Sequence, residues 1–139
     1  MSSSSKSCRY ASYPFFWNTQ PLQYPPNLRA MTERLGKVSH ENLHIRLADR
    51  WCVVDATFDP PLAAVGAPVT EHWDGVSDCA VAVDALDVVV HSSLEARNEY
   101  VLASKSGWTE GEIARYNEFC AALNVWLIDV RRSGSTPTV

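Results

Sequence analysis

The stretch His40–Thr57 reads HENLHIRLADRWCVVDAT and decides the fold of this chain. In its first half, apolar residues alternate with polar ones; the apolar positions are Leu43, Ile45 and Leu47. This period of two predicts a half-buried strand. After a short polar turn at Ala48–Asp49, the β-rich run Trp51–Ala56 predicts a second strand that returns antiparallel to the first. The sequence therefore predicts a β-hairpin.

The hairpin brings His40 and Asp55 together. A two-residue turn pairs Leu47 with Arg50 and leaves His40 one step diagonal to Asp55. A register slip of two residues would place the pair directly opposite. In either register both side chains lie on one face of the hairpin, within reach of each other. A histidine oriented by a carboxylate supplies two members of a nucleophilic triad, whereas a weak surface pair is the alternative interpretation.

The phrases around this pair resemble the transglutaminase-like superfamily, and its bacterial branch in particular. In that family a histidine opens one strand, a tryptophan opens the next, and an Asp-Ala-Thr phrase follows. Here these positions are His40, Trp51 and Asp55, with histidine and aspartate 15 residues apart. The similarity continues through FDPPL at 58–62 and WDGVSD at 73–78. The match covers the His/Asp-bearing, C-terminal portion of such a domain.

The resemblance implies a papain-like core portion and a Cys-His-Asp triad. His40 would deprotonate a thiol and Asp55 would orient the imidazole. The thiolate would attack a carboxamide carbonyl of a protein or peptide, and an amine or water would complete the transfer. Asn42 and His44 share that face and are candidate substrate-binding residues, and His44 is also a rival partner for Asp55. No cofactor is implied.

The nucleophile is the member that the sequence does not supply. The family places its cysteine at the N-terminus of a long helix, where the helix dipole favours the thiolate. Upstream of His40 there is only Cys8, in a segment without helical periodicity, and the prolines from Pro14 to Pro26 exclude a long helix there. Cys8 is therefore a poor candidate. The other cysteines fit small buried side chains, and no metal-binding spacing is present; these cysteines are Cys52, Cys79 and Cys120.

Three hypotheses follow. The first, which we favour, is a truncated or partial transglutaminase-like thiol acyltransferase or cysteine peptidase, inactive as this chain alone. The second is a pseudoenzyme that acts as a protein-binding module. The third is an unrelated α+β protein whose His40 and Asp55 are ordinary surface residues. An in-frame Gly-x-Cys phrase in the coding sequence upstream of Met1 would separate the first hypothesis from the second.

Composition bounds the class of protein. The chain has 139 residues, 46% hydrophobic and 20% charged, with a formal net charge of −4, which fits one globular domain. The absence of a basic stripe argues against nucleic-acid binding, and no apolar run approaches the ~18 residues of a membrane span. Four cysteines without a secretory signal predict a cytoplasmic protein.

The expected organisation is a disordered serine-rich lead at 1–12, a single domain at 13–133 and a flexible tail at 134–139. The proline- and aromatic-rich segment Ser12–Pro26 should be neither helix nor central strand. It is expected to lie extended and bury its aromatic residues; if exposed instead, it would bind partners or cause self-association.

The remaining pattern predicts an α+β fold with an antiparallel sheet of about four strands, including the hairpin at 40–58. Two further strands are expected at Cys79–Val83 and Asp87–His91. A short helix is expected at Leu28–Leu35, with Asn27 as N-cap and Gly36 as terminator. Two later helices are expected to open with capping boxes; the capping pairs are Ser92 with Glu95 and Thr109 with Glu112.

The last of these helices is strongly amphipathic. Its apolar residues recur at steps of three and one, from Ile113 to Val130. This spacing predicts the core-facing helix of the domain. Arg131 and Arg132 complement the C-terminal end of its dipole, and Gly134 is expected to follow it.

Overall fold

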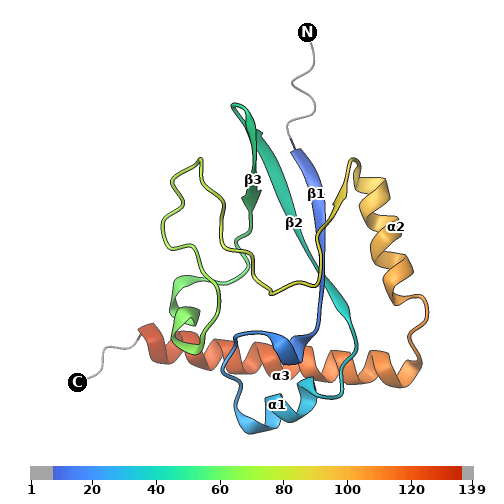
Figure 1. Cartoon of the computed structure of the whole chain (residues 1–139). Coiled ribbons are helices and arrows are strands. Elements are labelled where there is room, and N and C mark those ends of the chain that lie inside the picture. The colour runs from blue at the N-terminus through green and yellow to red at the C-terminus, as the bar shows by residue number, and fades with distance from the viewer. Residues whose placement is uncertain (1–7, 136–139) are drawn as a thin grey trace.

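The computed structural model describes residues 8–135, and it confirms an α+β fold built on one four-stranded antiparallel sheet. The strand order is β3-β2-β1-β4 (Figure 1). The strands are β1 (Cys8–Phe15), β2 (Val38–Leu47), β3 (Arg50–Val54) and β4 (Val89–His91). The helices are η2 (Trp17–Thr19), α1 (Pro26–Thr32), η3 (Pro60–Val65), α2 (Leu94–Lys105) and α3 (Glu110–Ser135), where η denotes a 3-10 helix. The parts of the expected lead and tail at 1–7 and 136–139 lie outside the described residues.

The predicted hairpin is confirmed with its two-residue turn. Leu47 pairs with Arg50 and Leu43 with Val54, so the strand direction carries Asp55 to a position beside Asn42. Ala48 in the turn has a φ of 54°, in the left-handed region that tight hairpins require at a turn position. This register is the one that leaves His40 diagonal to Asp55.

Strand β1 corrects two expectations. Residues 8–12 are part of the sheet rather than a disordered lead, and Ser12–Phe15 belongs to an inner strand between β2 and β4. Pro14 is tolerated because β4 pairs only with Tyr10–Ser12. Pro14 therefore has no partner residue in β4. Its carbonyl instead accepts a hydrogen bond from the N–H of Leu86, which precedes β4. The missing N–H of proline costs no ladder bond there.

Helix α3 forms the base of the molecule and lies beneath the sheet, with α1 on its other side (Figure 1). Its buried residues Phe119, Leu123 and Leu127 pack against α1 and η3, as the apolar stripe predicted. The aromatic residues after β1 join this core: Trp17 lies 5.0 Å from Phe15 and 5.2 Å from Phe119 between ring centroids. The aromatic segment is therefore part of the core and not an exposed patch.

Several predicted boundaries are wrong. Helix α1 begins at Pro26 and ends at Thr32, because a proline fits the first helical position and Asn27 lies inside the helix. The N-cap of α2 is Ser93, whose hydroxyl accepts the N–H of Ala96, and not Ser92. Helix α3 continues through Gly134. Its capping box is confirmed, with reciprocal hydrogen bonds of 2.8 and 3.1 Å between Thr109 and Glu112.

The strand expected at Cys79–Val83 is absent. This run is irregular, and its contacts with the sheet are single hydrogen bonds: the N–H of Cys79 donates to Val53 and the N–H of Ala82 donates to Asp55. The strand expected at Asp87–His91 is shortened to the three residues of β4. The apolar residues Ala82 and Val83 are nevertheless buried, because they cover one face of the sheet beside Tyr13.

Candidate functional site

The centre of the candidate site is the contact between His40 on β2 and Asp55 after β3. His40 Nε2 lies 2.7 Å from Asp55 Oδ2. The side chain of Asp55 is 2% exposed and that of His40 is 15% exposed. The carboxylate is therefore enclosed while the imidazole keeps an opening to solvent. We call the sheet face that carries them the dyad face; it also carries Arg9, Tyr13, Asn42 and His44.

Asp55 is held by five hydrogen bonds. Oδ2 accepts from His40, from Asn42 Nδ2 at 3.0 Å and from the N–H of Ala82 at 3.2 Å. Oδ1 accepts from the N–H and the hydroxyl of Thr57, at 3.2 and 2.6 Å. Burial by itself raises the pKa of Asp55, but the hydrogen bonds from His40, Thr57 and Asn42 outweigh burial and hold its pKa well below the ordinary value. Asp55 is consequently an anion at neutral pH.

An ionised Asp55 fixes the tautomer of His40. A carboxylate only accepts hydrogen bonds, so His40 Nε2 carries the proton in their contact. The other ring nitrogen, Nδ1, then holds a lone pair. Within residues 8–135, no side chain hydrogen-bonds to Nδ1. The geometry thus leaves a base nitrogen available, backed by a buried negative charge.

Asn42 closes the site on one side. Its Nδ2 must face Asp55, since the carboxylate accepts and the amide nitrogen donates. Its carbonyl oxygen Oδ1 is buried without a hydrogen-bond partner in the structure. A buried acceptor without a partner is costly, and this oxygen is enclosed by protein atoms rather than open to solvent.

His44 belongs to a neighbouring network and is not the rival partner of Asp55 that the sequence suggested. Its Nδ1 accepts from Arg9 Nε at 3.2 Å, and its Nε2 lies 2.8 Å from the hydroxyl of Tyr13. Because Arg9 only donates, His44 is neutral with its proton on Nε2. Burial, and then the charge of Arg9, lower the pKa of His44 below its ordinary value. Burial also raises the pKa of Tyr13, which keeps its hydroxyl protonated.

None of the four cysteines is hydrogen-bonded to His40 in the part of the chain that the structure describes. Cys8 is exposed at the start of β1, whereas His40 pairs with Tyr13 five residues further on, about 17 Å along the strand. Cys52 is buried on the opposite face, as predicted, and contacts the carbonyl of Val76. Cys79 is buried in the irregular segment and Cys120 lies half-buried on α3.

The opposite face of the sheet carries a polar network that the sequence did not reveal. The hydroxyl of Ser12 donates to Glu41 Oε1 at 2.6 Å and lies 2.9 Å from His91 Nε2. Ser39 donates to the other oxygen of Glu41 at 2.7 Å. We call this the relay face. Alternation on β2 puts Glu41 opposite to His40, but no local pattern indicates that β1 and β4 bring Ser12 and His91 to it.

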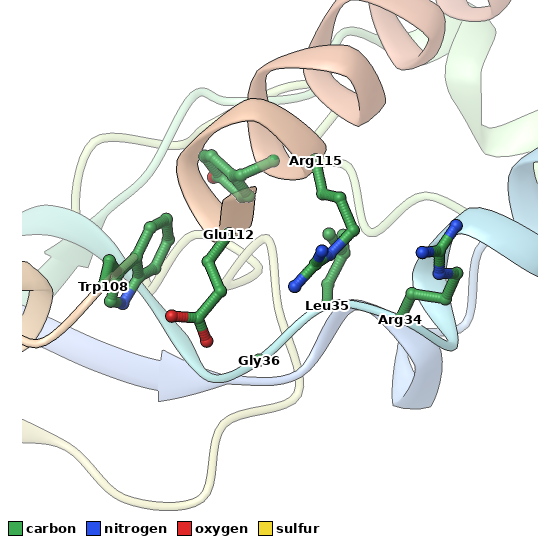
Figure 2. Close-up of a pocket in the computed structure, with 7 residues that line it drawn as sticks. Arg34, Leu35, Gly36, Trp108, Glu112 and Arg115 are labelled. Carbon is green, nitrogen blue, oxygen red and sulfur yellow. The ribbon is translucent and has the colours of Figure 1, made fainter. Parts of the chain in front are cut away.

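A small pocket lies where the chain enters β2 and meets the start of α3. Figure 2 shows Arg115 and Glu112 descending from α3 toward the segment of Arg34, Leu35 and Gly36, with Trp108 beside them. Its volume is about 40 Å³, which suits a few water molecules rather than a substrate. Neither His40 nor Asp55 lines it.

Residues 8–135 contain neither a metal-binding cluster nor a helix suited to span a membrane. No group of three or more histidine, cysteine, aspartate or glutamate side chains is arranged to hold a metal ion. None of the described helices has both the length and the apolar character of a membrane span.

Comparison of the chain with protein-family models, with curated proteins and with solved structures finds no match.

Proposed function

We propose that His40 and Asp55 are the base and the orienting residue of a transglutaminase-like thiol acyltransferase or cysteine-peptidase site, in a papain-like portion of such a domain. The observation that carries this proposal is the 2.7 Å hydrogen bond from His40 to an almost fully buried Asp55. An incidental surface pair would leave the aspartate solvated, whereas here the carboxylate accepts from Asn42, Thr57 and Ala82 as well.

The chemistry assigns each atom a role. A thiol brought to Nδ1 of His40 gives up its proton there, and the thiolate attacks the carbonyl carbon of a peptide or protein carboxamide. The protonated imidazole, stabilised by Asp55, returns the proton to the departing amine and leaves a thioester. Water or a second amine then attacks the carbonyl carbon of the thioester and transfers a proton to Nδ1, and the C–S bond breaks to release the acid or the new amide. The departing thiolate takes the proton back from the imidazole, which restores the thiol and the neutral histidine. Asn42 supports this dyad by donating its Nδ2 to Asp55 Oδ2.

No cysteine within residues 8–135 is hydrogen-bonded to His40, so the proposal requires a thiol from elsewhere. It would be supplied by another segment of the polypeptide or by a second chain. Cys8 is not proposed for this role, because its position on β1 separates it from His40.

A second candidate function is a non-catalytic protein-binding module that keeps the scaffold. The observation in its favour is that the described cysteines lie away from His40. In such a module the buried dyad would act as a structural element, and replacing His40 would change stability without changing any reaction rate.

The test is thiol-dependent cleavage of an activated acyl compound. The chain is mixed with p-nitrophenyl acetate and increasing concentrations of a small added thiol, and release of p-nitrophenolate is followed. We expect a protein-dependent rate that rises with thiol and falls about tenfold or more in His40→Gln and in Asp55→Asn, since general-base catalysis is lost.

His72 provides the matched control. His44 and His91 are each only 7% exposed, whereas His72 is exposed on the loop before Trp73. His72→Gln removes an accessible imidazole without touching the dyad and should leave the rate unchanged. Equal rates in His40→Gln, His72→Gln and the unsubstituted chain would reject the catalytic proposal and favour the binding module.

A further inference from the structure

A second cavity lies at the end of the dyad face where β1 begins. Its volume is about 410 Å³, and it is lined by Cys8, Arg9, Trp51, Val90 and Ser92. Arg9 reaches across β2 to place its guanidinium carbon 4.3 Å from the ring centroid of Trp51. The guanidinium of Arg46, from β2, lies 5.8 Å from the same ring. Two guanidinium groups therefore contact the ring of Trp51; Arg9 lines the cavity, and Arg46 lies outside its lining.

Arg9 is held in place by more than the stacking contact. Its Nε donates to His44 Nδ1, and His44 is in turn fixed by Tyr13. This uses one donor of the guanidinium, and among residues 8–135 no acceptor is hydrogen-bonded to its terminal nitrogens. The side chain is thus ordered before any ligand arrives, which reduces the entropy that binding would cost.

Within residues 8–135, no carboxylate forms an ion pair with Arg9 or Arg46; the nearby Asp78 pairs with Arg50 instead. The ion pairs within residues 8–135 join His40 to Asp55, Arg50 to Asp78 and Arg131 to Asp59. Arg9 and Arg46 take part in none of them, although the chain has an excess of four acidic residues over Lys and Arg. Two neighbouring guanidinium groups repel each other, and a bound anion would relieve that repulsion.

We propose that this cavity is a binding site for an oxyanion, a carboxylate or a phosphate group. The planar fork of Arg9 matches such groups, and Arg46 adds a second positive charge. Ser92 lines the same cavity, and it precedes Ser93, the N-cap of α2, by one residue, so the positive end of that helix is near in the chain. Trp51 and Val90 supply apolar walls for the organic part of the ligand. This site does not depend on the proposed function of His40 and Asp55.

Cys8 makes the proposal testable, because it is exposed and lines the cavity. Iodoacetate carries a carboxylate and iodoacetamide does not, and both alkylate a thiolate with loss of iodide. We would measure the ratio of their rates at Cys8 by mass spectrometry of the tryptic peptide, in the folded chain and in the chain unfolded by urea. The site predicts a ratio about tenfold higher in the folded chain, since a carboxylate attracted by Arg9 raises the concentration of iodoacetate at the cavity that Cys8 lines.

The variants and competitors identify the cause. Arg9→Gln and Arg46→Gln should each lower the ratio toward the unfolded value; Arg46 is exposed and its side chain forms no hydrogen bond in the structure, so its variant should fold. The control is Arg29→Gln, because Arg29 also stacks on an aromatic ring, 4.9 Å from Tyr24, but lines none of the described cavities. Acetate and inorganic phosphate are then added separately, and whichever slows iodoacetate identifies the preferred oxyanion.

A rate ratio in the folded chain equal to that of the unfolded chain would overturn the proposal. So would an elevated ratio that persists in both Arg9→Gln and Arg46→Gln. Neither result bears on the thiol-dependent assay of His40, so this inference and the proposed function fail separately.

Discussion

The two faces of the sheet each join a histidine to a carboxylate, but in a different order. On the dyad face, Asp55 contacts His40 Nε2 directly, and Nδ1 of the imidazole has no hydrogen-bond partner among the described side chains. On the relay face, the hydroxyl of Ser12 stands between Glu41 and His91. Since Ser12 donates to Glu41, it must accept from His91, and its proton is directed away from the imidazole.

This order decides what each network can do. A serine nucleophile must give its proton to a histidine and must be reachable, whereas Ser12 is fully buried and gives its proton to a carboxylate. The network of the relay face is therefore structural: its hydrogen bonds join Ser12 on β1 to Glu41 on β2 and to His91 on β4. On the dyad face, the carboxylate of Asp55 contacts Nε2 of the His40 imidazole, and Nδ1 of the same ring has no partner among the described side chains. The His40 side chain is 15% exposed to solvent. Similar residue types thus leave an imidazole nitrogen without a partner on one face and join a serine, a glutamate and a histidine by hydrogen bonds on the other.

The largest expected effect is the loss of Asp55. In Asp55→Ala, the donors of His40, Asn42, Thr57 and Ala82 lose their acceptor in a buried position. We expect the free energy of unfolding in urea to fall by about 3 kcal/mol. Asp59→Ala is the control, because Asp59 pairs with Arg131 at a half-exposed position and should cost under about 1 kcal/mol. Equal losses for the two variants would contradict the buried network.

Acid should weaken the fold through the same carboxyl group. The pKa of Asp55 is lower in the folded state than its ordinary value of 3.8, so the unfolded state binds the proton first as pH falls. Its contribution to the free energy of unfolding is complete above that ordinary value and is lost as pH falls toward the folded-state pKa. Asp55→Asn removes this contribution, so its stability should change less with pH in that acid range. Parallel pH profiles, measured by urea unfolding, would be inconsistent with a depressed pKa.

Ser12→Ala tests the relay face. It removes the partner of both Glu41 Oε1 and His91 Nε2, and we expect a loss of about 2 kcal/mol in the free energy of unfolding. Ser39→Ala, which removes a single hydrogen bond to Glu41, should cost less. Neither variant should alter the thiol-dependent rate that depends on His40. A rate loss in Ser12→Ala matching that of His40→Gln would show that the two faces are not separate in function.

His44 should add a smaller dependence at milder pH. Its pKa is lowered in the folded state, so below the ordinary value of 6.5 the unfolded state takes up a proton that the folded state resists. Stability should therefore decrease as pH falls from 6.5 toward the lowered pKa, and this decrease should be less steep in His44→Gln. Thermal unfolding of both chains at a series of pH values measures the effect, and identical slopes would argue against a neutral His44.

The smallest expected effect concerns Cys8 and His40. Because Cys8 lies at the far end of β1 from the residue that pairs with His40, His40→Ala should leave the rate of iodoacetamide labelling at Cys8 unchanged. Labelling is followed by mass spectrometry at a pH between 6 and 7. A slower rate in the variant would indicate a Cys–His pair and restore Cys8 as a nucleophile.

The parts of the molecule that local sequence determines were predicted well. The turn at Ala48–Asp49 fixes the register of β2 and β3, and the register fixes the contact of His40 with Asp55. The capping box of α3 is equally local. Strand β1 was missed because its pairing with β2 and β4 joins distant segments, and because Pro14 argues against an inner strand unless the end of β4 is known.

The difference between local and distant contacts also explains why two predictions near the site, the strand at Cys79–Val83 and the role of His44, are wrong. The run Cys79–Val83 has the composition of a buried strand, but it is held by Val53 and Asp55 through isolated hydrogen bonds and never forms a ladder. The contacts of His44 with Arg9 and Tyr13 cross from β2 to β1, so they could not be deduced before β1 was placed.

The separation of contacting residues along the chain also has a kinetic consequence. His40 and Asp55 are 15 residues apart, within one hairpin, whereas Ser12 and His91 are 79 residues apart. Closing a short loop costs less entropy than closing a long one, and hairpins form within microseconds. We therefore expect the hairpin to assemble early in folding, with β1 and β4 docking onto it later.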